Sequence, residues 1–190
     1  MSPSRSAGVN LIVALVACTS ATIGHAWLAT PQTQGASAGT AMTKTYVPES
    51  CPVTKPSSPP FVPPSPYPTS IPDSFSLGTE KLWIFLPANG TWSGLPHYNP
   101  TDTAFRQKLL WWRKGFDGRK DPQPKLKITG KRLDSAAPPL ETDHQANAGW
   151  TNDREHPFIV SGIDIPTLGC WEITGHFEDA ELSFVIWVTQ

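Results

Sequence analysis

Hydrophobic and polar residues alternate in several short stretches in the second half of the chain. In KLKITGKRL (125–133), Leu126 and Ile128 fall on one face, whereas lysines and a threonine fall on the other. This period of two is typical of a β-strand with one buried face and one face in water. Similar apolar or alternating stretches predict further strands at residues 81–87, 105–113, 157–165, 169–177 and 181–188.

Turn-forming residues separate these strands, and no stretch combines helical periodicity with capping residues. FDGRKDPQP (116–124) contains Asp-Gly and Asp-Pro, so we expect it to join 105–113 to 125–133 as a hairpin. Residues 134–156 form the longest expected unstructured connection. Six or seven short strands with turns rich in glycine and proline predict an all-β fold, an antiparallel β-sandwich.

An apolar run near the start, Leu11 to Ala17, follows Arg5 and ends at Cys18. It is shorter than the roughly 20 apolar residues that a membrane-spanning helix needs, and it suits a secretory signal. Its end, Leu-Val-Ala-Cys, resembles the bacterial lipobox. The resemblance implies a lipoprotein signal peptide over 1–17 and fatty acyl chains, such as palmitate, on Cys18. The alternative is an ordinary signal peptide cleaved after Ala26.

Between this signal and the predicted strands the composition changes twice. Residues 18–50 are rich in Ala, Thr, Ser, Gln and Gly, and predict a flexible linker. Residues 51–77 begin CPVTKPSSPPFVPPSPYP, whose prolines favour an extended chain. Because this segment also carries a cysteine and aromatic residues, we expect it to pack on a domain formed by 78–190. The alternative is a free Pro-rich ligand for a partner.

Three cysteines limit the possible disulfides to a small set. If Cys18 carries lipid, Cys51 and Cys170 remain, and disulfides persist outside the cytoplasm. One bridge between them would close a loop of about 120 residues, worth roughly 4–5 kcal/mol in the chain-entropy model. Two separate free thiols are the alternative.

The last part of the chain carries a second resemblance. GCWEITG (169–175), followed by the apolar strand LSFVIWV, resembles the closing hairpin of immunoglobulin-like domains in secreted bacterial proteins. With CPVT and PPFVPP near the start, residues 51–188 are similar to a family of uncharacterised bacterial exported proteins. The resemblance implies an immunoglobulin-like sandwich and no known activity. Antibody-type domains point both cysteines between the sheets, whereas alternation places Cys170 opposite Trp171 and Ile173. We therefore expect an outer-face disulfide that holds the Pro-rich segment.

Charge is distributed unevenly, although the net charge is −1. Residues 106–132 contain ten basic and two acidic side chains, whereas ten acids and one base follow from Asp134 onward. One interpretation is that basic and acidic strands pair across one sheet, at about 0.2–1 kcal/mol per pair. The other is a patch for an anionic surface, such as phospholipid headgroups or cell-wall polymers.

Motifs for chemistry are not found in the sequence. The chain lacks a Gly-x-Ser-x-Gly elbow, a glycine-rich phosphate loop and His or Cys pairs at metal-ligand spacing. We therefore expect no enzyme, no cofactor and no nucleic-acid partner. The alternative is a metal-binding protein or hydrolase built on 134–156, where Asp143, His144, Asp153 and His156 would gather around a divalent ion.

Tryptophan offers the best lead to a ligand. Adjacent Trp111 and Trp112 must face opposite sides of a strand, and Trp187 alternates away from the apolar face of the last strand. Trp112 and Trp187, with Trp83 or Trp92, therefore form a candidate glycan-binding surface, because exposed aromatic rings mark binding sites. The alternative is that the Pro-rich segment covers these rings.

These features together favour a membrane-anchored lipoprotein of the cell envelope, located in the outer membrane or periplasm in a Gram-negative organism. We expect its domain to be a non-catalytic binding or structural module. Its partner would be a cell-wall glycan or another envelope protein, and the sequence sets no oligomeric state.

Overall fold

The computed structural model describes residues 46–142, 145–152 and 155–190. The expected signal peptide, the lipidation site Cys18 and nearly all of the linker lie outside this part. The described residues contain no helix long and apolar enough to cross a membrane. They form ten β-strands: β1 (Ser74–Thr79), β2 (Leu82–Pro87), β3 (Thr91–Ser93), β4 (Phe105–Trp112), β5 (Lys127–Arg132), β6 (Leu140–Glu141), β7 (Asn147–Trp150), β8 (Pro157–Ile165), β9 (Gly169–Phe177) and β10 (Ala180–Thr189).

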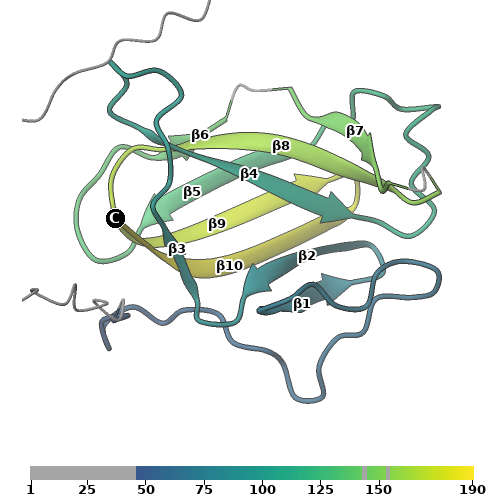
Figure 1. The fold of residues 1–190 in the computed structure, drawn as a ribbon, viewed down its shortest axis with the longest axis horizontal. Helices are drawn as coiled ribbons and strands as arrows, with labels where there is room; N and C mark the ends of the chain where they lie inside the picture. The colour runs from purple at the N-terminus through teal and green to yellow at the C-terminus, as the bar shows by residue number, and fades with distance from the viewer. Residues whose placement is uncertain (1–45, 143–144, 153–154) are drawn as a thin grey trace, which may run out of the picture. The chain divides into compact units, whose positions relative to one another are not determined.

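The strands build two five-stranded sheets that pack face to face (Figure 1). One sheet has the order β1-β2-β4-β8-β7, and the other has the order β3-β10-β9-β5-β6. The orders β2-β4-β8-β7 and β5-β9-β10 are those of strands A-B-E-D and C-F-G in immunoglobulin-like domains. The predicted sandwich is therefore confirmed, with one difference: β3 pairs with β10 in parallel, so that sheet is mixed.

Two predicted connections are wrong. Residues 113–126 do not form a hairpin, because β4 and β5 belong to different sheets and this loop crosses between them. Residues 134–156 are not one unstructured stretch, because β6 and β7 lie within them and each adds an edge to a sheet. Both strands are too short, and too mixed in composition, for a period of two to be recognised.

Large aromatic rings fill the space between the sheets. Trp111 of β4, Trp171 of β9 and Phe184 of β10 are fully or almost fully buried there. Gly175 faces the indole of Trp111, and a Cβ on this glycine would lie 2.5 Å from the ring atom Cη2. The indole therefore occupies the space between β4 and β9, the two strands whose counterparts are joined by a disulfide in antibody domains.

A second aromatic layer covers the outer face of the β1-β2-β4-β8-β7 sheet. Trp83 and Trp112 lie directly opposite each other in the β2–β4 pair, and both point away from the core between the sheets. Phe61 and Tyr67 pack on Trp83, with ring centroids 6.1 and 5.0 Å away. Both residues come from the N-terminal segment, residues 46–73, which precedes β1. Of the segment 51–77 that was expected to pack on the domain, residues 51–73 therefore do so, and residues 74–77 belong to β1.

The N-terminal segment is also fixed to the other sheet. A disulfide joins Cys51 to Cys170 of β9, as expected. Cys170 shares the outer face of β9 with the partly exposed Glu172, so the bridge does not run between the sheets. Beside it, Thr54 donates its N–H to the carbonyl of Val185 and accepts the Val185 N–H on its hydroxyl. The sandwich itself begins with β1 at Ser74, four residues before the expected boundary at 78.

Candidate ligand-binding site

The tryptophans proposed from the sequence do not form an open surface. Trp83 is 0% exposed and Trp112 is 3% exposed, because the N-terminal segment covers the first, and Phe85 and Phe158 pack on the second. The prediction that these two rings bind glycan is therefore wrong. Trp92 is buried in the core, and Trp187 is only partly exposed next to the disulfide-bonded Cys170.

One other tryptophan does face solvent. Trp150, the last residue of β7, is 37% exposed, whereas the other tryptophans of the described residues are buried or half-buried. Trp150 is not among the candidates from the sequence, because it falls in the stretch expected to be unstructured. Its one signal is a large aromatic residue within the otherwise polar NAGWTNDRE (147–155).

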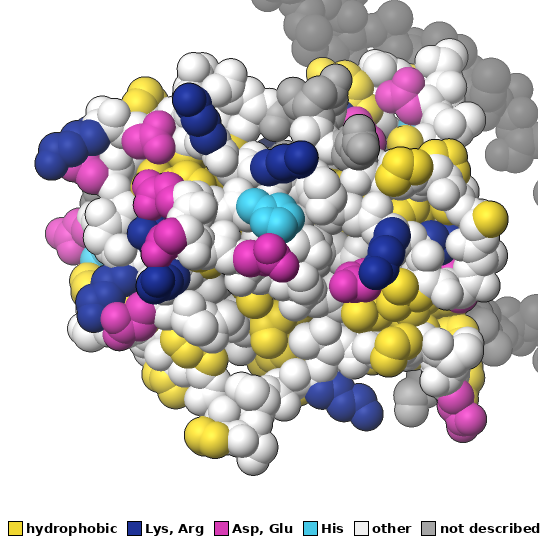
Figure 2. Space-filling view, turned by 180° about the vertical axis from the view of Figure 1, so that it is seen from behind, with side chains coloured by type: hydrophobic (Ala, Val, Ile, Leu, Met, Phe, Trp, Pro, Cys, Tyr) yellow, Lys and Arg dark blue, Asp and Glu magenta, His cyan; other side chains and the backbone are white. Residues whose placement is uncertain are grey.

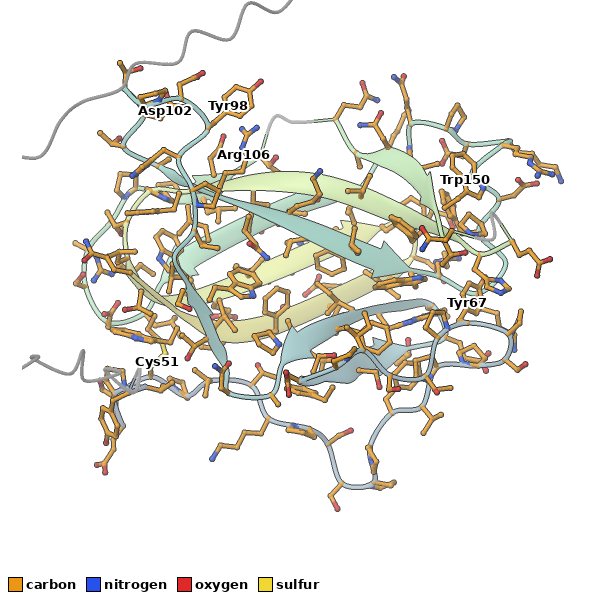
Figure 3. The ribbon with its side chains drawn as sticks, in the orientation of Figure 1. Cys51, Tyr67, Tyr98, Asp102, Arg106 and Trp150 are labelled. Atoms are coloured by element: carbon orange, nitrogen blue, oxygen red, sulfur yellow. A yellow bond between two sulfur atoms is a disulfide. The ribbon has the colours of Figure 1, made fainter. Side chains whose placement is uncertain are left out.

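Trp150 lies at one end of the sandwich, away from Cys51 (Figure 3). Two adjoining hollows share Trp150 in their lining. The larger hollow has a volume of about 700 Å³ and the smaller one about 430 Å³. Arg119 and Trp150 line both hollows. The other lining residues are Thr151 and Asn152 in the larger hollow, and Phe116, Asp117, Glu155 and Pro157 in the smaller one.

Strand pairing fixes the backbone at Trp150. Trp150 lies opposite Pro157 in the β7–β8 pair. In the turn that follows, Thr151 N–H donates to the carbonyl of His156 over 3.2 Å, and His156 N–H donates to the Thr151 hydroxyl over 3.3 Å. The open edge of β7 is tied by the Ala148 N–H, which donates to the carbonyl of Pro122 over 2.9 Å. The indole of Trp150 therefore projects from a strand that is hydrogen-bonded to β8 along one edge and to the carbonyl of Pro122 along the other.

The loop that carries Arg119 is folded around Asp117. The backbone N–H of Arg119 donates to Oδ1 of Asp117 over 3.0 Å, and Lys120 forms an ion pair with the same carboxylate. The hydrogen bond from Arg119 and the contacts with Lys120 lower the pKa of Asp117 below its usual value. Gly118 allows the loop to approach β7, because a Cβ there would lie 2.7 Å from Cβ of Ala148 and 3.0 Å from Cζ2 of Trp150.

Tyr67 of the N-terminal segment braces both loops. Its hydroxyl donates to the carbonyl of Arg113 over 3.1 Å and accepts the N–H of Gly115 over 3.2 Å. Its ring also contacts the ring of His156, with centroids 5.9 Å apart. One side chain therefore links residues 113–126 to the turn after Trp150.

The β9–β10 turn closes the same end of the molecule through ion pairs. Arg113 contacts Glu178 at 2.9 Å and Asp179 at 3.1 Å, and Lys81 contacts Asp179 at 2.7 Å. Hydrogen bonds from Lys81 and Arg113 lower the pKa of Asp179 to about 2.

The uneven charge along the chain is largely explained by pairing. Arg106 of β4 lies opposite Asp164 of β8 and bonds it at 2.7 Å, and Lys131 of β5 lies opposite Glu172 of β9 at 3.0 Å. Figure 2 shows basic and acidic side chains interspersed on the face that it displays. The pairing interpretation is confirmed for these residues, although the pairs belong to two sheets and not to one.

The proposed metal ligands can be placed only in part. Asp143, His144 and Asp153 lie outside the described residues, and His156 packs against Tyr67. Where the structure describes the chain, no three His, Cys, Asp or Glu side chains are grouped as for a metal ion.

Comparison with known proteins assigns neither a family nor a function to the chain. No protein-family model matches the chain, and neither a curated protein nor a solved structure matches it significantly. The candidate site therefore rests on its own geometry.

Proposed function

We propose that this protein is a lipid-anchored component of the bacterial cell envelope, similar to exported proteins with one immunoglobulin-like domain. The domain is a non-catalytic binding module that carries its ligand at Trp150. The exposed indole between two braced loops is the observation that carries the binding role, because a large apolar ring left in water commonly marks a contact surface.

Export and anchoring are supported by the cysteines. The Leu-Val-Ala-Cys sequence supplies a lipidation site at Cys18, and two or more acyl chains hold a protein on a bilayer far more firmly than one. The bridge between Cys51 and Cys170 supports the same location, because disulfides persist outside the reducing cytoplasm.

The position of the hollow suits a tethered binding module. Cys51 is bonded to Cys170 near the start of β9, whereas Trp150 lies at the end where β9 finishes. The seven residue-to-residue steps from Cys170 to Phe177 span about 23 Å at the usual rise of a strand. The chain from the anchor thus enters the domain at one end and leaves the other end free for a partner.

The lining of the hollow supports binding over catalysis. The backbone N–H of Arg119 and the contacts with Lys120 lower the pKa of Asp117, which suits this carboxylate to accept hydrogen bonds.

The intact mass of the protein purified from membranes of a bacterium with a lipoprotein pathway tests the proposal. We expect a chain that starts at Cys18 and carries diacylglycerol, with no alkylatable thiol at Cys51 or Cys170 before reduction. A Cys18→Ser variant should leave the membrane fraction, whereas the neighbouring Ser20→Ala variant should stay in it. An unacylated wild-type chain with free thiols at 51 and 170 would overturn the proposal.

A further inference from the structure

We infer that the Trp150 hollow binds a neutral sugar ring of a glycan. The ring lies with its C–H face on the indole of Trp150, while its hydroxyls bond to Arg119 and Asn152. This inference rests on the proposed binding role and names the chemical class of the ligand.

The indole presents a fixed apolar surface. Gly118 allows the loop backbone to pack beside Cζ2 of Trp150, and Pro157 lies opposite Trp150 across the strand pair. Trp150 also borders the larger hollow, which Arg119 and Asn152 line as well. A flat apolar ring that is held in place at a surface matches the C–H face of a pyranose, which is also flat and apolar.

Polar groups at the rim match the hydroxyls of a sugar. A hydroxyl both donates and accepts, and the rim supplies both functions. Arg119 offers guanidinium donors, Asn152 offers an amide, and Asp117 offers carboxylate oxygens. Arg119 is exposed, and among the described residues it forms no ion pair that would occupy its donors.

Charge and size favour a neutral glycan over other ligands. Among the described residues, Arg119 lines both hollows and two carboxylates, Asp117 and Glu155, line the smaller one. This part of the lining has no positive excess that would select phosphate or a nucleic acid. The volume of about 700 Å³ falls within the usual range of small-molecule sites, roughly 300–1,000 Å³. Because the lining residues Arg119 and Asn152 are exposed, one ring of a longer chain can enter without burying its neighbours.

The test is calorimetric titration of the full chain, made soluble by Cys18→Ser, with defined neutral oligosaccharides. The probes are β-1,4-linked N-acetylglucosamine tetramer, maltotetraose, and oligomers of mannose, galactose and arabinose. We expect at least one probe to bind and to change tryptophan fluorescence. Trp150→Ala should weaken that binding about tenfold or more, and Trp150→Phe should retain much of it.

Tyr98→Ala is the matched control, because Tyr98 is also an exposed aromatic residue and lies away from the hollow (Figure 3). It should leave sugar binding unchanged, and circular dichroism and urea unfolding should show that every variant is folded under the titration conditions. If no probe binds, or if binding survives Trp150→Ala, the inference is overturned. The lipid anchor in the proposed function is tested by a separate experiment, because it depends on the mass and acylation of the mature chain.

Discussion

Replacing both half-cystines, Cys51→Ala together with Cys170→Ala, tests whether the N-terminal segment is part of the folded domain. The two cysteines are 119 residues apart in the sequence, and both are buried on the outer face of the sheet that contains β9. The bridge restricts the unfolded chain, so its loss should stabilise the unfolded ensemble more than it disturbs the native state.

The magnitude follows from the size of the closed loop. A separation of 119 residues gives about 5 kcal/mol in the chain-entropy model, an upper value because measured disulfides contribute roughly 2–4 kcal/mol. Thr54 and Tyr67 still hold the N-terminal segment to the sandwich through hydrogen bonds, so the domain should remain folded. We expect the free energy of unfolding to fall by about 2–5 kcal/mol, which lowers the melting temperature by roughly 10 °C for a domain of this size.

Urea denaturation followed by tryptophan fluorescence measures this change in the soluble Cys18→Ser chain. Reduced wild-type protein is the matched control, because it lacks the bridge but keeps both sulfur atoms, and it should unfold at the same urea concentration as the double variant. A change below about 1 kcal/mol with an unaltered urea dependence would refute the reasoning. It would mean that Cys51 and the segment around it are not held on the native domain.

Three further results are expected. Gly175→Ala places a Cβ against the buried ring of Trp111, so overpacking should lower the free energy of unfolding in urea by about 1–3 kcal/mol. Tyr67→Phe removes one hydrogen bond to each of two backbone groups, which should cost about 1–2 kcal/mol in the same assay without changing the circular dichroism of the strands. Two cations hold the pKa of Asp179 at about 2, below the unfolded value of about 3.9. This carboxylate therefore stabilises the fold above pH 4 and loses its effect as the pH falls toward 2, so Asp179→Asn should show a smaller drop in melting temperature than wild type over that interval.

The long strands could be predicted from the sequence because a single physical rule governs them. In β8 and β9 the buried and partly exposed residues alternate, and the bounds predicted at 157–165 and 169–177 are those observed. The shortest strands do not follow this rule. β3 has three residues and β6 has two, so their positions depend on neighbours far away in the sequence. The same dependence explains why the hairpin predicted at 116–124 is absent, since local turn residues do not report which sheet a strand joins.

The candidate site was harder to predict than the fold, because exposure is a tertiary property. Alternation correctly placed Trp112 away from the core between the sheets, but it could not show that Phe85 and Phe158 cover that side as well. Conversely, Trp150 belongs to a four-residue strand whose exposure depends on the distant loop around Gly118. The available signal was a tryptophan within a polar stretch. This signal indicates a binding site only once the positions of the surrounding loops are known.

The proline-rich composition of the N-terminal segment has a physical reason that links the fold to the site. Without this segment, Trp83 would lie open on the outer face of its sheet, and soluble domains avoid apolar patches of that kind. A covering chain must be ordered over many residues without pairing its backbone in a sheet. Proline suits this role because its φ is already fixed and it has no N–H to leave unsatisfied, so that ordering it costs less entropy. Tyr67 then uses the same covering chain to hold the loops on both sides of Trp150. The segment that resembles a linker in composition is thus what fixes the geometry of the proposed binding site.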